Sequence, residues 1–159
     1  MIGDWTEYGA IDMAGELSKT VYDTRDKAAI GGFLSVREHH KKEWERTEFG
    51  FFVVLVMDKT KATYHYTQPE PGEGTRVSQE IPTGLKPRGF CHTHPKSDST
   101  GDFGSDDLES FRKAVKVAGG IFYYLMNPFQ ELRYAQVERD FLRGKPLEWI
   151  QVPFDDLKK

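Results

Sequence analysis

The chain has 159 residues, which is enough for one domain of ordinary size with its own hydrophobic core. Hydrophobic residues make up 38% and charged residues 30% of the sequence, so the composition is that of a globular protein and excludes a disordered one. The net charge is -3 and the basic residues form no stripe, which excludes nucleic acid as an expected partner.

Cysteine usage and the start of the chain favour a reducing compartment. Cys91 is the only cysteine, so no disulfide can form within the chain. Residues Met1–Ala10 lack the basic start and the apolar run of a signal peptide. The longest apolar run, Phe49–Met57, is too short to span a membrane. We therefore expect a cytoplasmic protein, or one delivered by a secretion system that needs no signal peptide, and no membrane partner.

The first predicted element is a helix over Asp23–Val36. Its apolar residues recur at helical spacing and Asp26 is the expected N-cap, although the glycine pair Gly31-Gly32 weakens the helical pattern. The charged segment Arg37–Thr47 follows this helix. It is interpreted as a solvated loop or a frayed extension of the helix, with the adjacent His39 and His40 in contact with water.

A central strand is predicted over Glu48–Met57, because near-continuous apolar character is typical of strands buried on both faces. The turn residues 58–61 connect it to a strand over Ala62–Thr67, so the two form a hairpin. The remaining predicted elements are a strand over Arg76–Ile81, a strand over Gly89–His94, an amphipathic helix over Asp106–Ala118, strands over Ile121–Met126, Arg133–Val137 and Leu147–Val152, and a turn at Asn127-Pro128. This order predicts a single α+β domain over residues 1–159, with a mixed, mostly antiparallel sheet flanked by helices.

The motif with the clearest chemistry is His92-Thr93-His94-Pro95. Side chains alternate between the two faces of a strand, so His92 and His94 project to the same side and can share one metal ion. Cys91 and Thr93 point to the other side, which makes Cys91 a poor ligand or nucleophile. The alternative is a pair of structural or surface histidines, and an isolated motif of this kind would favour that alternative.

A carboxylate downstream extends the candidate ligand set. Asp107 lies in the first turn of the predicted helix and on the same inward stripe as Phe111 and Val115. A buried carboxylate needs a partner, and a cation shared with the two histidines supplies one. Two imidazoles and one carboxylate leave a fourth position for water, which is the pattern of a catalytic zinc site. Helix capping by Ser105 or Asp106 is the alternative, and both roles can coexist.

A catalytic site of this kind needs a general base, and Glu48 is the candidate. It opens the apolar strand Glu48–Met57, where a carboxylate becomes partly desolvated. The alternative is that Glu48 only ends the charged segment before the strand. Glu38, Glu43 and Glu45 are rivals in less suitable positions.

In order and spacing, Glu48, the motif His92-Thr93-His94-Pro95 and Asp107 resemble the pattern of the JAB/JAMM (MPN+) zinc metalloproteases. The sequence more closely resembles the JAB-like domain of bacterial polymorphic and rearrangement-hotspot toxins, over about residues 23–140. The further motifs that carry this resemblance are Asp26-Lys27-Ala28-Ala29, Glu48-Phe49-Gly50, Tyr64-His65-Tyr66-Thr67, Phe103-Gly104-Ser105-Asp106-Asp107 and Tyr124-Leu125-Met126-Asn127-Pro128.

The resemblance implies a JAB/MPN-like (cytidine-deaminase-like) fold and a zinc-dependent peptidase or isopeptidase acting on a protein or peptide, with ubiquitin-like proteins among the candidates. His92, His94 and Asp107 would hold Zn2+, and Glu48 would be the general base. In the family, a serine three residues before the aspartate is thought to bind the oxyanion. Gly104 stands in that position here, and Ser105, one residue late, would take the role of the oxyanion residue if the loop shifts.

The alternative is a catalytically weak or inactive JAB-like binding module, or a toxin domain that acts through a protein partner such as a cognate immunity protein. Gly104 is the residue that supports this alternative, since a missing oxyanion donor elsewhere costs roughly 2.7–4 kcal/mol of transition-state stabilisation. A neighbouring immunity-like gene would favour a toxin, and neighbouring genes for ubiquitin-like proteins would favour a deconjugase.

Overall fold

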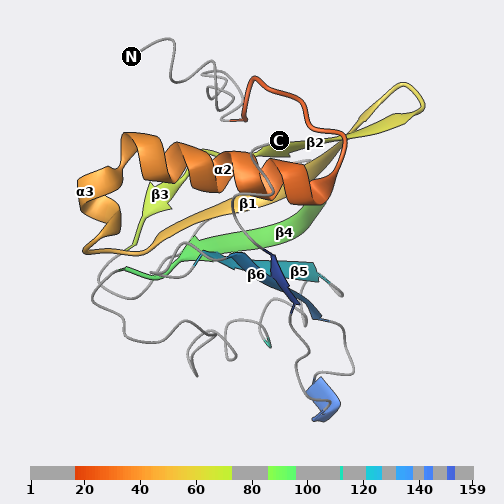
Figure 1. The fold of residues 1–159 in the computed structure, drawn as a ribbon. Helices are drawn as coiled ribbons and strands as arrows, with labels where there is room; N and C mark the ends of the chain where they lie inside the picture. The colour runs from red at the N-terminus through yellow and green to blue at the C-terminus, as the bar shows by residue number, and fades with distance from the viewer. Residues whose placement is uncertain are drawn as a thin grey trace.

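A computed structural model describes residues 17–72, 86–95, 112, 121–126, 132–137, 142–144 and 150–152. The described part contains two helices and seven strands. They are α2 (Arg25–His39), α3 (Lys41–Trp44), β1 (Phe49–Asp58), β2 (Lys61–Tyr66), β3 (Glu70–Pro71), β4 (Lys86–Thr93), β5 (Ile121–Met126), β6 (Leu132–Val137) and β7 (Ile150–Val152). Helix α2 lies across one face of the sheet, and α3 continues it at one end (Figure 1).

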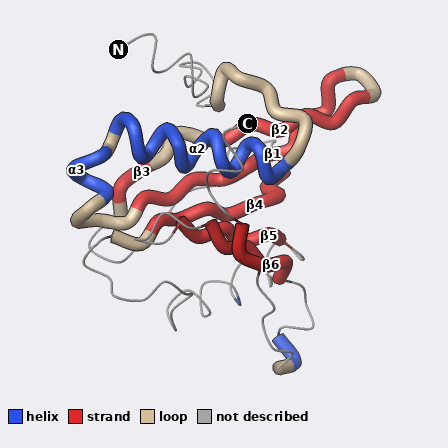
Figure 2. Tube along the Cα trace, in the orientation of Figure 1, coloured by secondary structure: helices blue, strands red, loops and turns tan. Residues whose placement is uncertain are grey.

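The strands form one sheet in the order β2-β1-β4-β5-β6-β7, and the short β3 pairs with β1 beside the start of that strand. Among the described strands only β4 and β5 run parallel, and all other pairs are antiparallel. Figure 2 shows these strands lying side by side beneath α2. The prediction of an α+β fold with a mixed, mostly antiparallel sheet is therefore confirmed.

Strand β1 is the central strand that the apolar run predicted. It pairs with β2 on one side and β4 on the other, and Phe51, Val53 and Val54 are completely buried. The β1–β2 hairpin is also confirmed, with a turn at Lys59, whose φ of 57° lies in the left-handed region. Strands β4 to β7 all overlap their predicted ranges.

Helix α2 begins at Arg25 and extends to His39, three residues beyond its predicted end. The predicted N-cap, Asp26, is wrong. Thr24 has the extended backbone of a cap (φ -133°, ψ 152°), and its hydroxyl accepts a hydrogen bond from the Lys27 N–H at 3.1 Å. Asp26 lies inside the first turn, where its carboxylate accepts a hydrogen bond from the Tyr124 hydroxyl and so joins the helix to β5.

The glycine pair in α2 permits close packing instead of ending the helix. A Cβ at Gly31 would overlap the Tyr22 side chain, and a Cβ at Gly32 would overlap the Phe51 ring. Both glycines are buried. Glycine has a lower helical propensity, but at these two positions a larger residue would overlap a neighbouring side chain.

The charged segment after α2 is mostly exposed, as the interpretation as a solvated loop expected, but Trp44 is buried and His39 and His40 are half-buried. The alternative of a helical extension is closer, because α3 forms over Lys41–Trp44 and Trp44 is only 3% exposed. His39 belongs to α2 and is half-buried. The ring of His40 packs against Phe49 at a centroid distance of 4.8 Å. The segment therefore contacts the core through Trp44 and His40, while its charged neighbours face the solvent.

The sheet has two different faces. The face under α2 carries the main hydrophobic core, which includes Phe51, Cys91 and Tyr124 together with Phe33 of the helix. The opposite face carries Phe52 and Phe90, whose rings meet edge to face at 5.2 Å. This second face also carries His92, by alternation from Cys91.

Several predictions lie outside the described residues: the strand over Arg76–Ile81, the turn at Asn127-Pro128 and all but one residue of the helix over Asp106–Ala118. Arg112, the one described residue of that helix, is helical. None of the helices in the described part of the chain is long and apolar enough to cross a membrane.

Candidate metal centre

The structure brings His92 and His94 together at the end of β4. The strand ends at Thr93, and Pro95 follows His94. The backbone N–H of His94 donates a hydrogen bond to the Met126 carbonyl at 3.0 Å, which extends the strand-like backbone by one residue. The two imidazole centroids are 5.2 Å apart, and the residues are only 2% and 4% exposed. The two rings are therefore close enough to bind one ion.

Glu48 lies beside the histidine pair because of the register between β1 and β4. Gly50 pairs with His92, so the residues just before Gly50 lie next to those just after His92. Glu48 is 5% exposed, and its carbonyl accepts a hydrogen bond from the Gly72 N–H at 2.7 Å. One carboxylate oxygen and one nitrogen of each imidazole all lie within 4.8 Å of one another. These three residues could hold a metal ion.

The rival glutamates are not brought to this group. Glu38, Glu43 and Glu45 are all exposed, whereas Glu48 is buried. Glu38 forms instead a salt bridge with Arg37 at 3.8 Å. Of the four carboxylates that the sequence offered as the base, only Glu48 lies beside the histidines.

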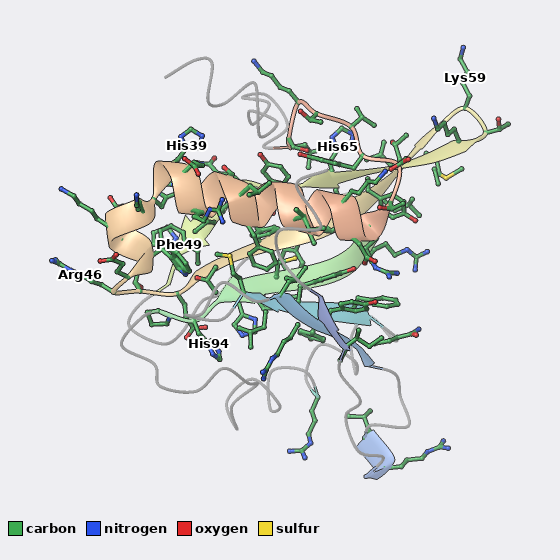
Figure 3. The ribbon with its side chains drawn as sticks, viewed as in Figure 1. His39, Arg46, Phe49, Lys59, His65 and His94 are labelled. Carbon is green, nitrogen blue, oxygen red and sulfur yellow. The ribbon has the colours of Figure 1, made fainter. Side chains whose placement is uncertain are left out.

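Thr93 connects the two strands that carry the centre. Its hydroxyl accepts a hydrogen bond from the backbone N–H of Phe49 at 2.9 Å. Phe49 follows Glu48, and Thr93 lies between the two histidines, so this bond fixes the two halves of the centre relative to each other. Figure 3 shows Phe49 beneath α2 and His94 on the other side of the sheet, both near the α3 end.

Cys91 is excluded as a nucleophile by its position. It is completely buried in the core under α2, on the opposite face from His92. Burial raises the pKa of its thiol well above the usual value, and the negative charge of Asp26 raises it further. The reactive thiolate is therefore strongly disfavoured, as the strand alternation predicted.

Aromatic residues give the centre an apolar environment. The Phe90 ring stacks on the imidazole of His92 at 6.1 Å and meets the Tyr123 ring at 5.7 Å. Tyr123 is 1% exposed, and burial raises the pKa of its phenol above the usual value. Electrostatic interactions are stronger in such surroundings than in water. The neighbour of His92 on β1 is Gly50, which places no side chain beside the imidazole.

Two predicted site residues, Ser105 and Asp107, lie outside the described residues, as does Gly104. The structure therefore tests neither the third predicted ligand nor the oxyanion residue. The strand order also aligns one charged residue with His92 that the sequence pattern did not indicate. Arg133 on β6 shares a row across the sheet with Leu125 and His92. The signal was an arginine between Leu132 and Tyr134 in a predicted strand, but its relation to His92 depends on the strand order.

A donor set of two imidazoles and one carboxylate in a buried position could hold a divalent transition-metal ion. Comparisons of the chain with protein-family models, with curated proteins and with solved structures give no match. The fold and this candidate metal centre therefore carry the functional argument.

Proposed function

We propose that this protein is a zinc-dependent hydrolase of peptide or isopeptide bonds, of the JAB/JAMM type. The observation that carries the proposal is the buried group of Glu48, His92 and His94, whose ligand atoms lie within 4.8 Å of one another. The order of these residues along the chain, and an α+β fold that places them at one end of a mixed sheet, support the same proposal.

His92 and His94 would hold the ion, together with Asp107. When bound, zinc supplies a Lewis acid that polarises a scissile carbonyl and lowers the pKa of water. Glu48 accepts a proton from the attacking water at its carboxylate and delivers that proton to the leaving amine. The buried position of Glu48 limits competing water, and its strand start is fixed by the hydrogen bond from Phe49 to Thr93.

The geometry also allows Glu48 to be a direct ligand, since one oxygen of its carboxylate lies within 4.8 Å of one nitrogen of each imidazole. The two roles predict different behaviour of one variant. Glu48→Gln keeps the metal and loses turnover if Glu48 is the base. The same variant loses the metal if Glu48 is a ligand.

The substrate is proposed to be a protein or peptide, and the physiological role that of a bacterial deconjugase or a toxin effector. An extended peptide can bind by adding to a strand edge. The exposed residues Glu70 and Pro71 of β3 border β1 at Gly50, next to the candidate centre. The segment is held there by the Thr47 hydroxyl, which donates to the Gly72 carbonyl at 2.8 Å.

Metal content measured on the purified protein, beside His92→Ala/His94→Ala, is the first test. About one zinc ion per chain in the wild type and none in the double variant is the expected result for a mononuclear site. The second step compares Glu48→Gln with Glu43→Gln, in which the same change is made at an exposed glutamate. Hydrolysis of peptide and isopeptide libraries should be lost in the first variant alone.

A wild-type protein that takes up no metal on reconstitution would overturn the proposal. Stoichiometric zinc without hydrolysis of any library would instead support the alternative of an inactive JAB-like module that acts through a protein partner.

A further inference from the structure

Arg133 lies on the same face of the sheet as His92. His92 pairs with Leu125 across β4 and β5, and Leu125 pairs with Arg133 across β5 and β6. Residues paired across neighbouring strands share a face, so these three side chains form one row. The flanking residues support this assignment, because Leu132 and Tyr134 pack against the core under α2 and therefore leave Arg133 on the other face.

The spacing along this row is set by the sheet itself. Neighbouring strands are about 4.8 Å apart, so the Cα atoms of His92 and Arg133 are about 10 Å apart. Side chains stand roughly perpendicular to the sheet. The fully buried Leu125 lies between His92 and Arg133 in this row. A ligand therefore needs a length of about 10 Å to extend from the centre to Arg133.

Arginine is suited to an anionic ligand, and the anion that a peptide substrate offers is a carboxylate. Its planar guanidinium remains charged at every physiological pH and binds a carboxylate through two parallel hydrogen bonds. Arg133 is half-buried and its row neighbour is apolar, so its interaction with an anion is weakened less by water than at an exposed site.

We propose that Arg133 binds a carboxylate of the substrate while the scissile bond lies at the centre formed by Glu48, His92 and His94. Arg133 is thus a specificity-determining residue, and the substrate carries a carboxylate about 10 Å or less from the scissile carbonyl. The carboxylate belongs to a free C-terminus or to an acidic side chain. This inference rests on the proposed metal-dependent function.

The test uses the cobalt(II)-substituted protein, because a thiolate bound to cobalt gives a distinct absorption band. The probes are mercaptoalkanoates of increasing chain length and the matching mercaptoalkanamides, which differ only in the charged end. The proteins are the wild type, Arg133→Met, Arg133→Lys and the control Arg37→Met. Arg37 belongs to α2, on the other side of the sheet.

The wild type should bind the best carboxylate probe about tenfold or more tightly than its amide, since a hydrogen bond to a charged group contributes about 1.5–3 kcal/mol. Arg133→Met should lose this preference and still bind the amide, which shows an intact centre. Arg133→Lys should retain part of the preference. Arg37→Met should behave as the wild type.

Three short peptides then distinguish the source of the carboxylate: one with a free C-terminus, its C-terminal amide, and that amide carrying one glutamate. The peptide whose displacement of the probe depends on Arg133 identifies the source. Equal affinity of the wild type for the carboxylate probe and its amide would overturn the inference, and so would a preference for the carboxylate that is unchanged in Arg133→Met. Either result would leave the proposed function standing. A protein that binds no cobalt would overturn both.

Discussion

The hydroxyl of Thr93 accepts a hydrogen bond from the backbone N–H of Phe49, 2.9 Å away, in the buried layer between β1 and β4. This single bond connects the residue between the two histidines to the residue after Glu48. The candidate centre is therefore not only a set of ligands at one strand end. It depends on a contact made on the opposite face of the sheet from the imidazoles.

Replacing Thr93 by Val should weaken both the fold and the centre. The Phe49 N–H would be left buried without its acceptor, which lowers the free energy of unfolding by about 1–3 kcal/mol. The shift of Glu48 relative to the histidines should also lower metal affinity, measured by competition with a chromophoric chelator. Thr67→Val is the matched control. The Thr67 hydroxyl accepts a hydrogen bond of 2.8 Å from the Phe52 N–H, and neither residue is next to a histidine of the centre in the sequence. Thr67→Val should lose a similar amount of stability and keep the metal affinity of the wild type. Equal metal affinities of the two variants would contradict a role of the Thr93–Phe49 hydrogen bond in metal binding.

Gly32→Ala should destabilise α2 despite the better helical propensity of alanine. The new Cβ would overlap the fully buried Phe51 ring, so the helix must move away from β1. Overpacking of this kind costs about 1–3 kcal/mol, measurable by urea denaturation. The same change combined with Phe51→Leu should be less harmful than the sum of the two single changes. Strict additivity would show that the Phe51 ring is not the obstacle.

Thr24→Ala should lower the free energy of unfolding by about 1 kcal/mol, because the Lys27 N–H loses its capping acceptor. Thr24→Ser retains the hydroxyl and should remain close to the wild type. The comparison is made by thermal and urea denaturation of the three proteins. Equal stability of the alanine and serine variants would mean that the hydroxyl does not cap the helix.

Alkaline stability should depend on Tyr22. Burial raises the pKa of its phenol from 10.0 to about 12, and the hydrogen bond with Thr20 offsets part of this shift. The unfolded chain then loses its proton first as the pH rises, so the free energy of unfolding falls between about pH 10 and pH 12. Two pH units correspond to about 2.7 kcal/mol, and solvent screening of the half-buried Tyr22 lowers the expected effect below this limit. Tyr22→Phe should show a smaller alkaline loss than the wild type when urea unfolding is followed across this range.

The spacing of apolar and polar residues along the chain correctly predicted which side of a strand a residue faces and which strand is central. The two-residue alternation of a strand placed His92 and His94 on one side, away from Cys91. The apolar run after Glu48 predicted a central strand, and β1 is one. The predicted cap failed because threonine and aspartate are both good caps, and the choice between them depends on the contact of Asp26 with Tyr124, far along the chain.

Other features depend on register and direction, which short patterns do not encode. The approach of Glu48 to the histidines follows from the pairing of Gly50 with His92. The position of Arg133 requires the strand order β4-β5-β6. The burial of Trp44 depends on where α2 ends, and its charged neighbours in the sequence suggested the opposite.

The parallel pairing of β4 with β5 also bears on the order in which the chain folds. Antiparallel neighbours such as β1 and β2 can be joined by a tight turn, whereas parallel strands need a crossover of a dozen or more residues. Closing long loops is slow because it reduces chain entropy before contacts reward it. The β1–β2 hairpin can therefore form early. Glu48 comes next to the histidines only when β1 also pairs with β4, which lies further along the chain. A nascent chain in which only the hairpin has been synthesised contains Glu48 but neither histidine. Its affinity for metal therefore arises only after β4 has been synthesised and has paired with β1.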